Sequence, residues 1–146
     1  MKNARHAFIG AAYFCTSLAA GLATSAAKIT NISLDCTEIT SGDIILMRAH
    51  FADKTEAKTF AVTFQAEPDF GTDREVTVVV AGVPIGALMS QVIVGGYVGG
   101  EMSFSDPVVP FTQTKGFPSD FPSAVKRNAQ VSLTAGGKTL VSCRLE

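Results

Sequence analysis

The stretch AQVSLTAGGKTLVSC, residues 129–143, predicts an antiparallel hairpin. Val131 and Leu133 alternate with polar neighbours, and the same alternation returns in KTLVSC after the glycine pair. A period of two places alternate side chains on one face, which is typical of a half-buried strand. Gly136 and Gly137 can adopt the positive backbone angles that a tight hairpin turn requires. The end of the chain therefore predicts two paired strands that share an apolar face.

The same alternation recurs upstream. In KTFAVTFQA, for example, Phe60, Val62 and Phe64 share one face. Turn-forming residues separate such runs, and no segment of ten or more residues shows helical spacing. Many short strands with glycine-rich turns predict one all-β domain, either a β-sandwich or a small barrel. About eight strands are expected, over residues 29–36, 43–51, 58–66, 74–81, 85–94, 99–105, 129–135 and 138–145.

Residues 1–27 have the pattern of a secretory signal peptide. Lys2 and Arg5 form a basic start, an apolar run covers residues 7–23, and TSAAK supplies the small residues of a cleavage site. An uncleaved membrane anchor is the alternative, although the apolar run is only at the lower edge of a spanning length. We therefore expect a periplasmic or extracellular domain over residues 28–146, with no membrane span after cleavage.

Two cysteines, Cys36 and Cys143, follow the predicted leader. An even pair in an exported protein usually forms a disulfide. Both cysteines fall in the apolar set of their expected strands, which supports the pairing independently of the compartment. We expect a Cys36–Cys143 bridge that ties the first strand to the last, and two free buried thiols are the alternative.

A family resemblance covers residues 58–145. The order KTF-V-F, VTVVVAGVPIG, VGGEMSF, DFPS and AQVSLTAGGKTLVSCRL resembles a small secreted bacterial β-sandwich domain of unassigned function. Such domains carry an apolar strand that ends in a glycine turn, a Val-Gly pair, and a Phe-Pro before the last hairpin. The resemblance implies an immunoglobulin-like sandwich and supplies no catalytic residue. A fold alone does not assign a function.

Few residues after the leader have a pattern typical of catalysis or metal binding. His50 is the single histidine there, which leaves a triad or a zinc site short of partners, and no G-x-S-x-G motif is present. We expect His50 to be a surface strand residue on the face of Arg48, and we expect neither an enzyme nor a cofactor. The acidic loop containing Glu67, Asp69 and Asp73 could hold calcium weakly, but the same residues are ordinary turn formers.

The segment DPVVPFTQTKGFPSDFPSAVK, residues 106–126, holds four of the six prolines and has no regular pattern. Loops of this length in compact domains are often functional. Its phenylalanines could anchor a partner or could cap the open end of a sandwich. The second role is slightly preferred, because large apolar side chains are more often buried. If a ligand site exists, we expect it to use Phe111, Phe117, Asp120 and Phe121.

These observations favour an exported, non-enzymatic binding module of the bacterial envelope, with an unidentified protein or glycan partner. A structural or assembly subunit of a surface layer or fibre is the main alternative. A secreted inhibitor and a hydrolase built on carboxylates are further ones. Loss of Lys2 and Arg5 with the leader takes the formal net charge from −1 to −3, and no basic stripe remains, so a nucleic-acid partner is not expected.

Overall fold

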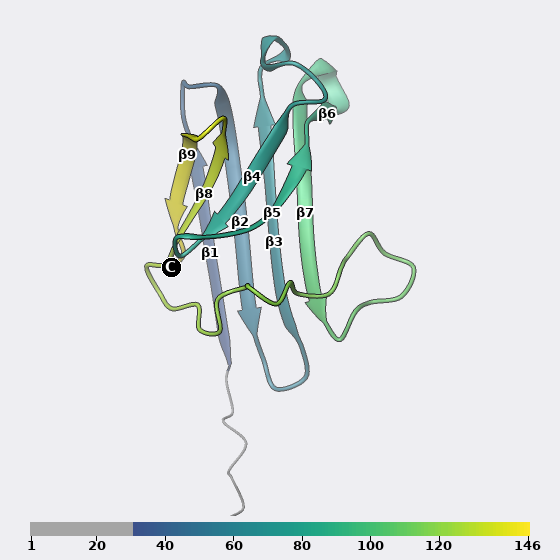
Figure 1. Ribbon diagram of the computed structural model, residues 1–146, viewed down its shortest axis with the longest axis vertical. Coiled ribbons are helices and arrows are strands. Elements are labelled where there is room, and N and C mark those ends of the chain that lie inside the picture. The colour runs from purple at the N-terminus through teal and green to yellow at the C-terminus, as the bar shows by residue number, and fades with distance from the viewer. Residues whose placement is uncertain (1–30) are drawn as a thin grey trace, which may run out of the picture.

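The computed structural model describes residues 31–146, so the predicted leader lies outside the described residues. Two antiparallel sheets face each other, which confirms the predicted all-β sandwich (Figure 1). No helix in the described part of the chain is long and apolar enough to cross a membrane. The strands are β1 Ile32–Ile39, β2 Ile44–Asp53, β3 Lys58–Ala66, β4 Glu75–Val80, β5 Val83–Met89, β6 Gln91–Val92, β7 Val98–Asp106, β8 Gln130–Ala135 and β9 Lys138–Arg144.

The strand order is immunoglobulin-like. One sheet has the order β1-β2-β3-β7-β6 and the other has the order β5-β4-β8-β9. If β2 and β3 take the places of strands A and B, the two sheets follow the A-B-E-D and C′-C-F-G arrangement of immunoglobulin-like sandwiches. Strand β1 is then an additional edge strand, placed before A. The chain therefore crosses between the sheets after β3, after β5 and after β7.

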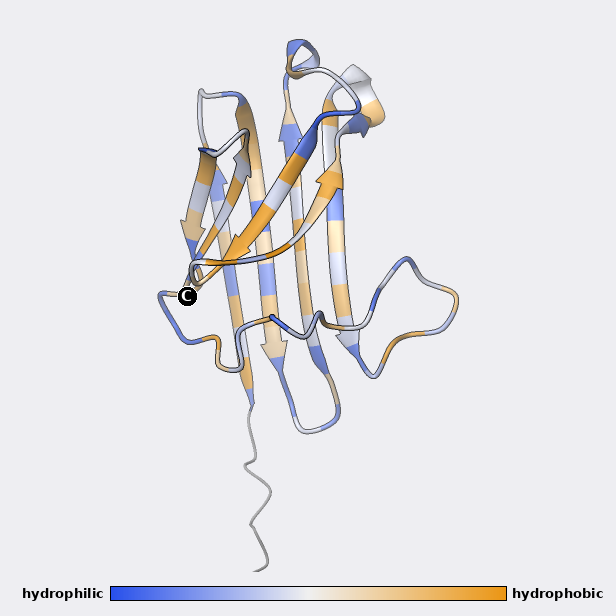
Figure 2. Cartoon of the chain, in the orientation of Figure 1, coloured by the Kyte–Doolittle hydropathy of each residue, from blue (hydrophilic) through white to orange (hydrophobic). Residues whose placement is uncertain are grey.

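The alternating side chains meet between the two sheets. In β3, Phe60, Val62 and Phe64 are buried while their neighbours are only partly covered, as the sequence predicts. Val131 and Leu133 of β8 are also fully buried, and Gly136 and Gly137 have positive φ in the turn to β9. Figure 2 shows apolar residues alternating with polar ones along these strands. The predicted hairpin is confirmed.

The strand predicted over residues 85–94 is wrong, because the chain changes sheets at Ser90. Strand β5 lies in one sheet and β6 lies in the other, which gives nine strands rather than eight. Ser90 is almost completely buried, and its hydroxyl accepts from Arg74 N at 2.9 Å and donates to Gly71 O at 2.8 Å. Its backbone also pairs with Arg74 O and Asp73 N. These four bonds fix the crossing point. They satisfy the hydroxyl and the backbone polar groups of the buried Ser90 where it leaves the sheet.

The remaining boundaries differ from the predicted ones by a few residues. The largest shift is in the first strand, which continues to Ile39 instead of ending at residue 36. The additional residues still pair with β2, because Ile39 lies opposite Leu46 in the register.

One seam of the sandwich is closed by covalent and hydrogen bonds. The predicted Cys36–Cys143 disulfide is present and joins β1 to β9, with 5.8 Å between the two Cα atoms. Beside it, Asp35 and Glu146 exchange backbone hydrogen bonds of 3.1 and 3.0 Å. The disulfide thus links the edge strands of the two sheets, whereas antibody domains link strands B and F inside the sandwich.

Removing the disulfide should destabilise the domain strongly. The bridge spans 107 residues of sequence, and the chain-entropy model gives about 4–5 kcal/mol for a loop of this size. We expect a Cys36→Ser, Cys143→Ser double variant to lose that much unfolding free energy in a urea titration. Addition of a reductant should lower the stability of the wild type towards that of the variant and leave the variant unchanged. If the wild type and the variant had equal unfolding free energies without reductant, this explanation would be contradicted.

The stability of the domain should depend on the Ser90 hydroxyl at the point where the chain changes sheets. Ser90→Ala leaves the part-buried Arg74 N–H and Gly71 carbonyl without their partner, and an unsatisfied group costs about 1–3 kcal/mol when it is fully buried. We expect a loss at the lower end of that range by urea titration. The matched control is Ser33→Ala on β1, whose exposed position should leave the stability within about 0.5 kcal/mol of the wild type.

Candidate functional site

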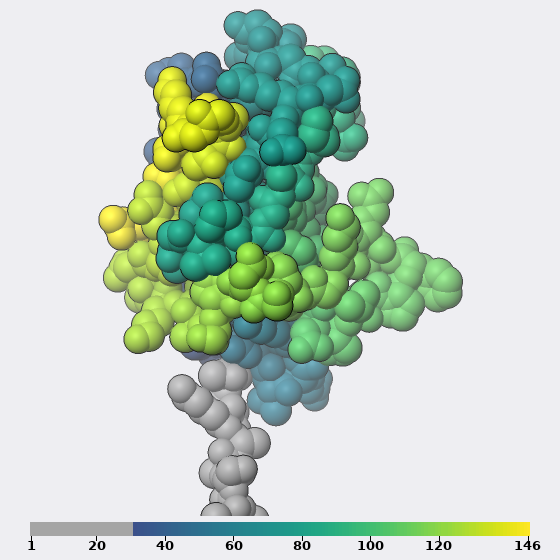
Figure 3. All heavy atoms as spheres, viewed as in Figure 1, coloured from purple at the N-terminus to yellow at the C-terminus, as the bar shows by residue number. Residues whose placement is uncertain are grey.

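The crossover from β7 to β8 has two halves, one packed against the sandwich and one protruding from it. We call residues 107–115 the tip segment and residues 116–126 the plug segment. The plug segment runs across the lower end of the sandwich in Figure 1, whereas the tip segment projects from the body at the right of Figure 3. The single long loop expected from the sequence therefore combines a structural part and a protruding part.

Phe121 anchors the plug segment in the core. Its side chain is 8% exposed, and its ring centroid lies 5.6 Å from that of Phe60 and 6.4 Å from that of Phe104. Phe117 packs against it edge-on, with 4.7 Å between centroids. Val125 is buried further along the segment. Aromatic rings at these distances are favourably placed, so the plug segment is held by the same cluster that fills the sandwich.

A lysine covers the outer side of this cluster. The Nζ atom of Lys58 lies 4.9 Å from the ring centroid of Phe117 and 5.0 Å from that of Phe121. A cation within about 6 Å of a ring face is attracted by its negative electrostatic potential. Lys58 thus occupies the surface that these two rings would otherwise offer to a ligand.

The tip segment is tied down at its base. Lys115 forms a one-residue parallel bridge beside Phe104, with Ser105 N donating to Lys115 O at 2.9 Å and Lys115 N donating to Ser103 O at 3.1 Å. The buried Ser105 hydroxyl donates to Pro107 O at 2.6 Å. Both ends of the tip segment are therefore fixed on β7, and the residues between them are displayed from a rigid edge.

Phe111 stands at the far end of the tip segment and is fully exposed. Its φ of +62° is rare for a bulky residue, and such conformations persist only where the surrounding structure imposes them. Thr112 closes the turn behind it by donating to Val109 O at 2.9 Å. Val108 and Val109 are half-exposed. The tip therefore presents a small apolar surface that the domain itself does not cover.

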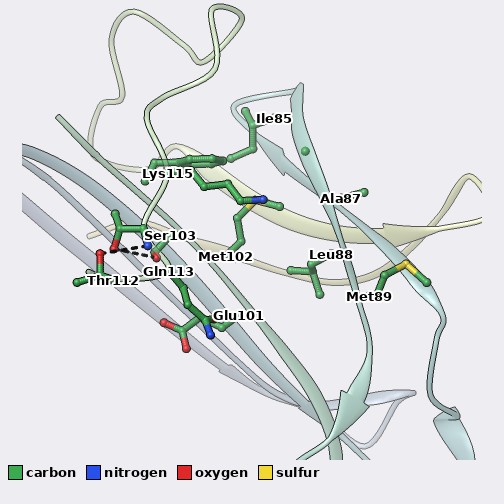
Figure 4. Close-up of a pocket in the computed structure, with 13 residues that line it drawn as sticks. Ile85, Ala87, Leu88, Met89, Glu101, Met102, Ser103, Thr112, Gln113 and Lys115 are labelled. Atoms are coloured by element: carbon green, nitrogen blue, oxygen red, sulfur yellow. Dashed lines mark hydrogen bonds between the residues drawn. The ribbon is translucent and has the colours of Figure 1, made fainter. Parts of the chain in front are cut away.

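A groove opens beside the tip segment, between β5 and β7. It has a volume of about 1170 Å³, and Figure 4 shows the side chains that line it. Strand β6 pairs with β7 only at Val98 and Gly99, so the rest of this edge of β7 faces the groove until Lys115. The lining combines apolar and charged groups: Ile85, Leu88, Met89 and Met102, with Glu101 and Lys115.

The groove is the feature that sequence reasoning missed. It depends on β5 and β7 lying side by side, although they belong to different sheets. We call this side of the sandwich, opposite the disulfide-linked β1 and β9, the open seam. Gly100 carried the signal, since a Cβ at this position would collide with the Leu88 side chain. A glycine inside a strand often marks such a close approach, and the partner could not be named from the sequence.

The four predicted ligand residues are therefore divided by the structure. Phe111 and Asp120 are exposed, Phe117 is partly covered, and Phe121 is buried. The first lies on the tip segment and the other three lie on the plug segment. The use of any of them by a ligand stays a prediction, but only Phe111 offers a whole aromatic ring to solvent.

His50 lies where the sequence placed it, on the outer face of β2. Its Nδ1 is 2.7 Å from Asp35 Oδ1 on the neighbouring strand; the Asp35 side chain is largely exposed and the His50 side chain is partly covered. His50 and Arg48 border a shallow hollow of about 260 Å³. Thr37 and Thr63 line the same hollow, and among residues 31–146 the hydrogen bond to Asp35 is the one found for the His50 ring.

The acidic loop has a structural use. Residues 68–70 form a turn of 3₁₀-helix in which Phe70 N donates to Glu67 O at 3.0 Å. Phe70 is buried, and the Arg74 guanidinium lies 4.3 Å from its ring centroid. Within the described residues, no three His, Cys, Asp or Glu side chains gather closely enough to hold a metal ion. Of the two roles expected for the loop with Glu67, Asp69 and Asp73, the structure shows the turn. This turn places Phe70 in the core.

Comparisons of this chain with protein-family models, with curated proteins and with solved structures gave no match. The resemblance to small secreted bacterial domains is therefore an expectation from the sequence, and the site has to be argued from its own geometry.

Alanine substitutions should separate the two halves of the crossover. We expect Phe121→Ala to lose about 3–5 kcal/mol of unfolding free energy, as deletion of a buried aromatic ring does. Phe117→Ala should lose less, because its ring is partly covered. Phe111→Ala is the matched surface control and should stay within about 0.5 kcal/mol of the wild type. A large loss at Phe111, or none at Phe121, in urea titrations would contradict this division.

Proposed function

We propose that the protein is an exported binding module of the bacterial envelope and that the tip segment is its contact element. The observation that carries the proposal is the complete exposure of Phe111 on a loop whose two ends are hydrogen-bonded to β7. Apolar side chains of this size are usually buried in a monomer. Phe111 is left outside although the adjacent plug segment buries Phe121 in the core.

The hydrogen bonds that anchor the tip at both ends favour binding over a structural role. An aromatic residue on a preordered loop loses little conformational entropy on contact, and such residues dominate the energy of many interfaces. The stability of the sandwich depends on the plug segment and the disulfide. A partner can therefore engage the tip without disturbing the core.

The chemistry around Phe111 favours a protein partner over a glycan. Val108 and Val109 add half-exposed apolar surface to the fully exposed ring. The hydroxyl of Thr112 is already engaged with Val109 O, and the exposed Gln113 adds one polar group to the same segment. A mainly apolar surface with a polar group at its side matches a protein interface, in which apolar anchors are surrounded by a polar rim.

Export is supported by two features. The pattern of residues 1–27 is that of a secretory leader, and the Cys36–Cys143 disulfide is typical of a non-reducing compartment. The resemblance to small secreted bacterial β-sandwich domains agrees with a periplasmic or extracellular location. The proposal assigns no catalytic residue.

Site-specific photo-crosslinking tests the proposal. Replacement of Phe111 by a benzophenone-bearing phenylalanine keeps an aromatic ring at this position, and irradiation of host cells should link it to a defined partner. The matched control carries the same group at Lys138, an exposed residue of the β8–β9 hairpin. We expect a crosslinked product at position 111 that is absent at position 138. Excess unlabelled wild-type protein should suppress this product, whereas excess Phe111→Asp protein should not. Equal labelling at the two positions, or no labelling at either, would contradict the proposal.

A further inference from the structure

The tip segment and the groove lie side by side on the open seam of the sandwich. Residues 112–115 form part of the groove wall, and Phe111 precedes them directly. Because Phe111 is fully exposed, its ring does not enter the groove of its own chain. The domain thus carries an uncovered apolar protrusion and a groove with mixed apolar and charged lining at the same edge.

We infer that the groove is filled by a second copy of the chain, with Phe111 of each copy inserted between β5 and β7 of the other. This inference rests on the proposed use of the tip as a contact element. In a twofold dimer the same patch serves both subunits, so a residue and its contact site must lie on one surface. The adjacency of tip and groove meets that condition, since one axis brings both contacts together.

The lining of the groove matches the tip in chemistry. Met102 is partly exposed in the groove and Met89 at the rim is half-exposed, while Ile85 beneath them is buried in the core. Glu101 and Lys115 place opposite charges in the same groove, as Figure 4 shows. Opposite charges on a self-complementary surface can pair across a twofold axis, whereas a groove of one sign would repel its copy.

The size of the contact points to a reversible dimer. A buried phenylalanine removes roughly 150–250 Å² from water, and two insertions with their flanking valines and groove walls approach the roughly 1,200 Å² of small specific interfaces. Interfaces of this size are often transient. The dimer should therefore form in a concentration-dependent way.

Sedimentation velocity on the exported protein over about 1–500 μM tests the inference. We expect the average mass to rise from one chain towards two, with half-association in the micromolar range. Phe111→Asp should stay monomeric throughout, because it removes the aromatic ring that fills the groove and puts a carboxylate beside Met89 and Met102. Ala87→Asp should do the same from the opposite side, since Ala87 is an exposed residue of the groove wall. Lys138→Asp, away from both features, is the control and should dimerise like the wild type.

A cysteine pair identifies the contact. A Phe111→Cys copy mixed with an Ala87→Cys copy should form an intermolecular disulfide, and neither copy should do so alone. Thermal unfolding of each variant shows that it is folded. A wild type that stays monomeric overturns the inference, as does a dimer that survives Phe111→Asp or Ala87→Asp. If the benzophenone at position 111 then labels a different protein, the proposed function stands while the self-association fails.

Discussion

The burial of Phe121 is the contact on which the arrangement of the crossover depends. Its ring packs against Phe51, Phe60 and Phe104, which belong to three neighbouring strands of one sheet. The segment that carries it then continues to β8 in the other sheet. The end of the core is thereby covered by a chain that has to pass between sheets in any case. With the plug held there, the residues before it are left outside as the tip segment.

The sequence predicted the strands, their buried faces and the disulfide, because each follows from local alternation. Phe60, Val62 and Phe64 had to share a face, and Cys36 and Cys143 belonged to the inward sets of their strands. The change of sheet at Ser90 could not be predicted, because a serine within an apolar run has no local signal for four hydrogen bonds to a distant loop. Local pattern thus determines which residues face inwards, whereas long-range polar contacts determine where the chain turns.

The candidate site shows the same limit. Phe111 and Phe121 have similar proline-rich neighbours, and nothing in their local sequence separates a surface residue from a core residue. The difference arises from the positions of Phe51, Phe60 and Phe104, which are far away along the chain. The groove depends in the same way on the approach of Gly100 to Leu88 across the two sheets. Composition could identify residues 106–126 as an unusual loop, but it could not distinguish the exposed tip segment from the buried plug segment.

The two seams of the sandwich differ in how far they are closed, and this difference supports the proposed function. The β1–β9 seam is closed by a disulfide and by the backbone bonds between Asp35 and Glu146. At the other seam, β6 is two residues long, and much of the edge of β7 is left to a groove. Open strand edges with apolar surroundings invite association, and proteins usually protect them. Among the described residues, the tip segment covers this edge at Lys115 while its far end points away, so the uncovered edge and the exposed ring of Phe111 are best explained together, as two parts of one contact surface.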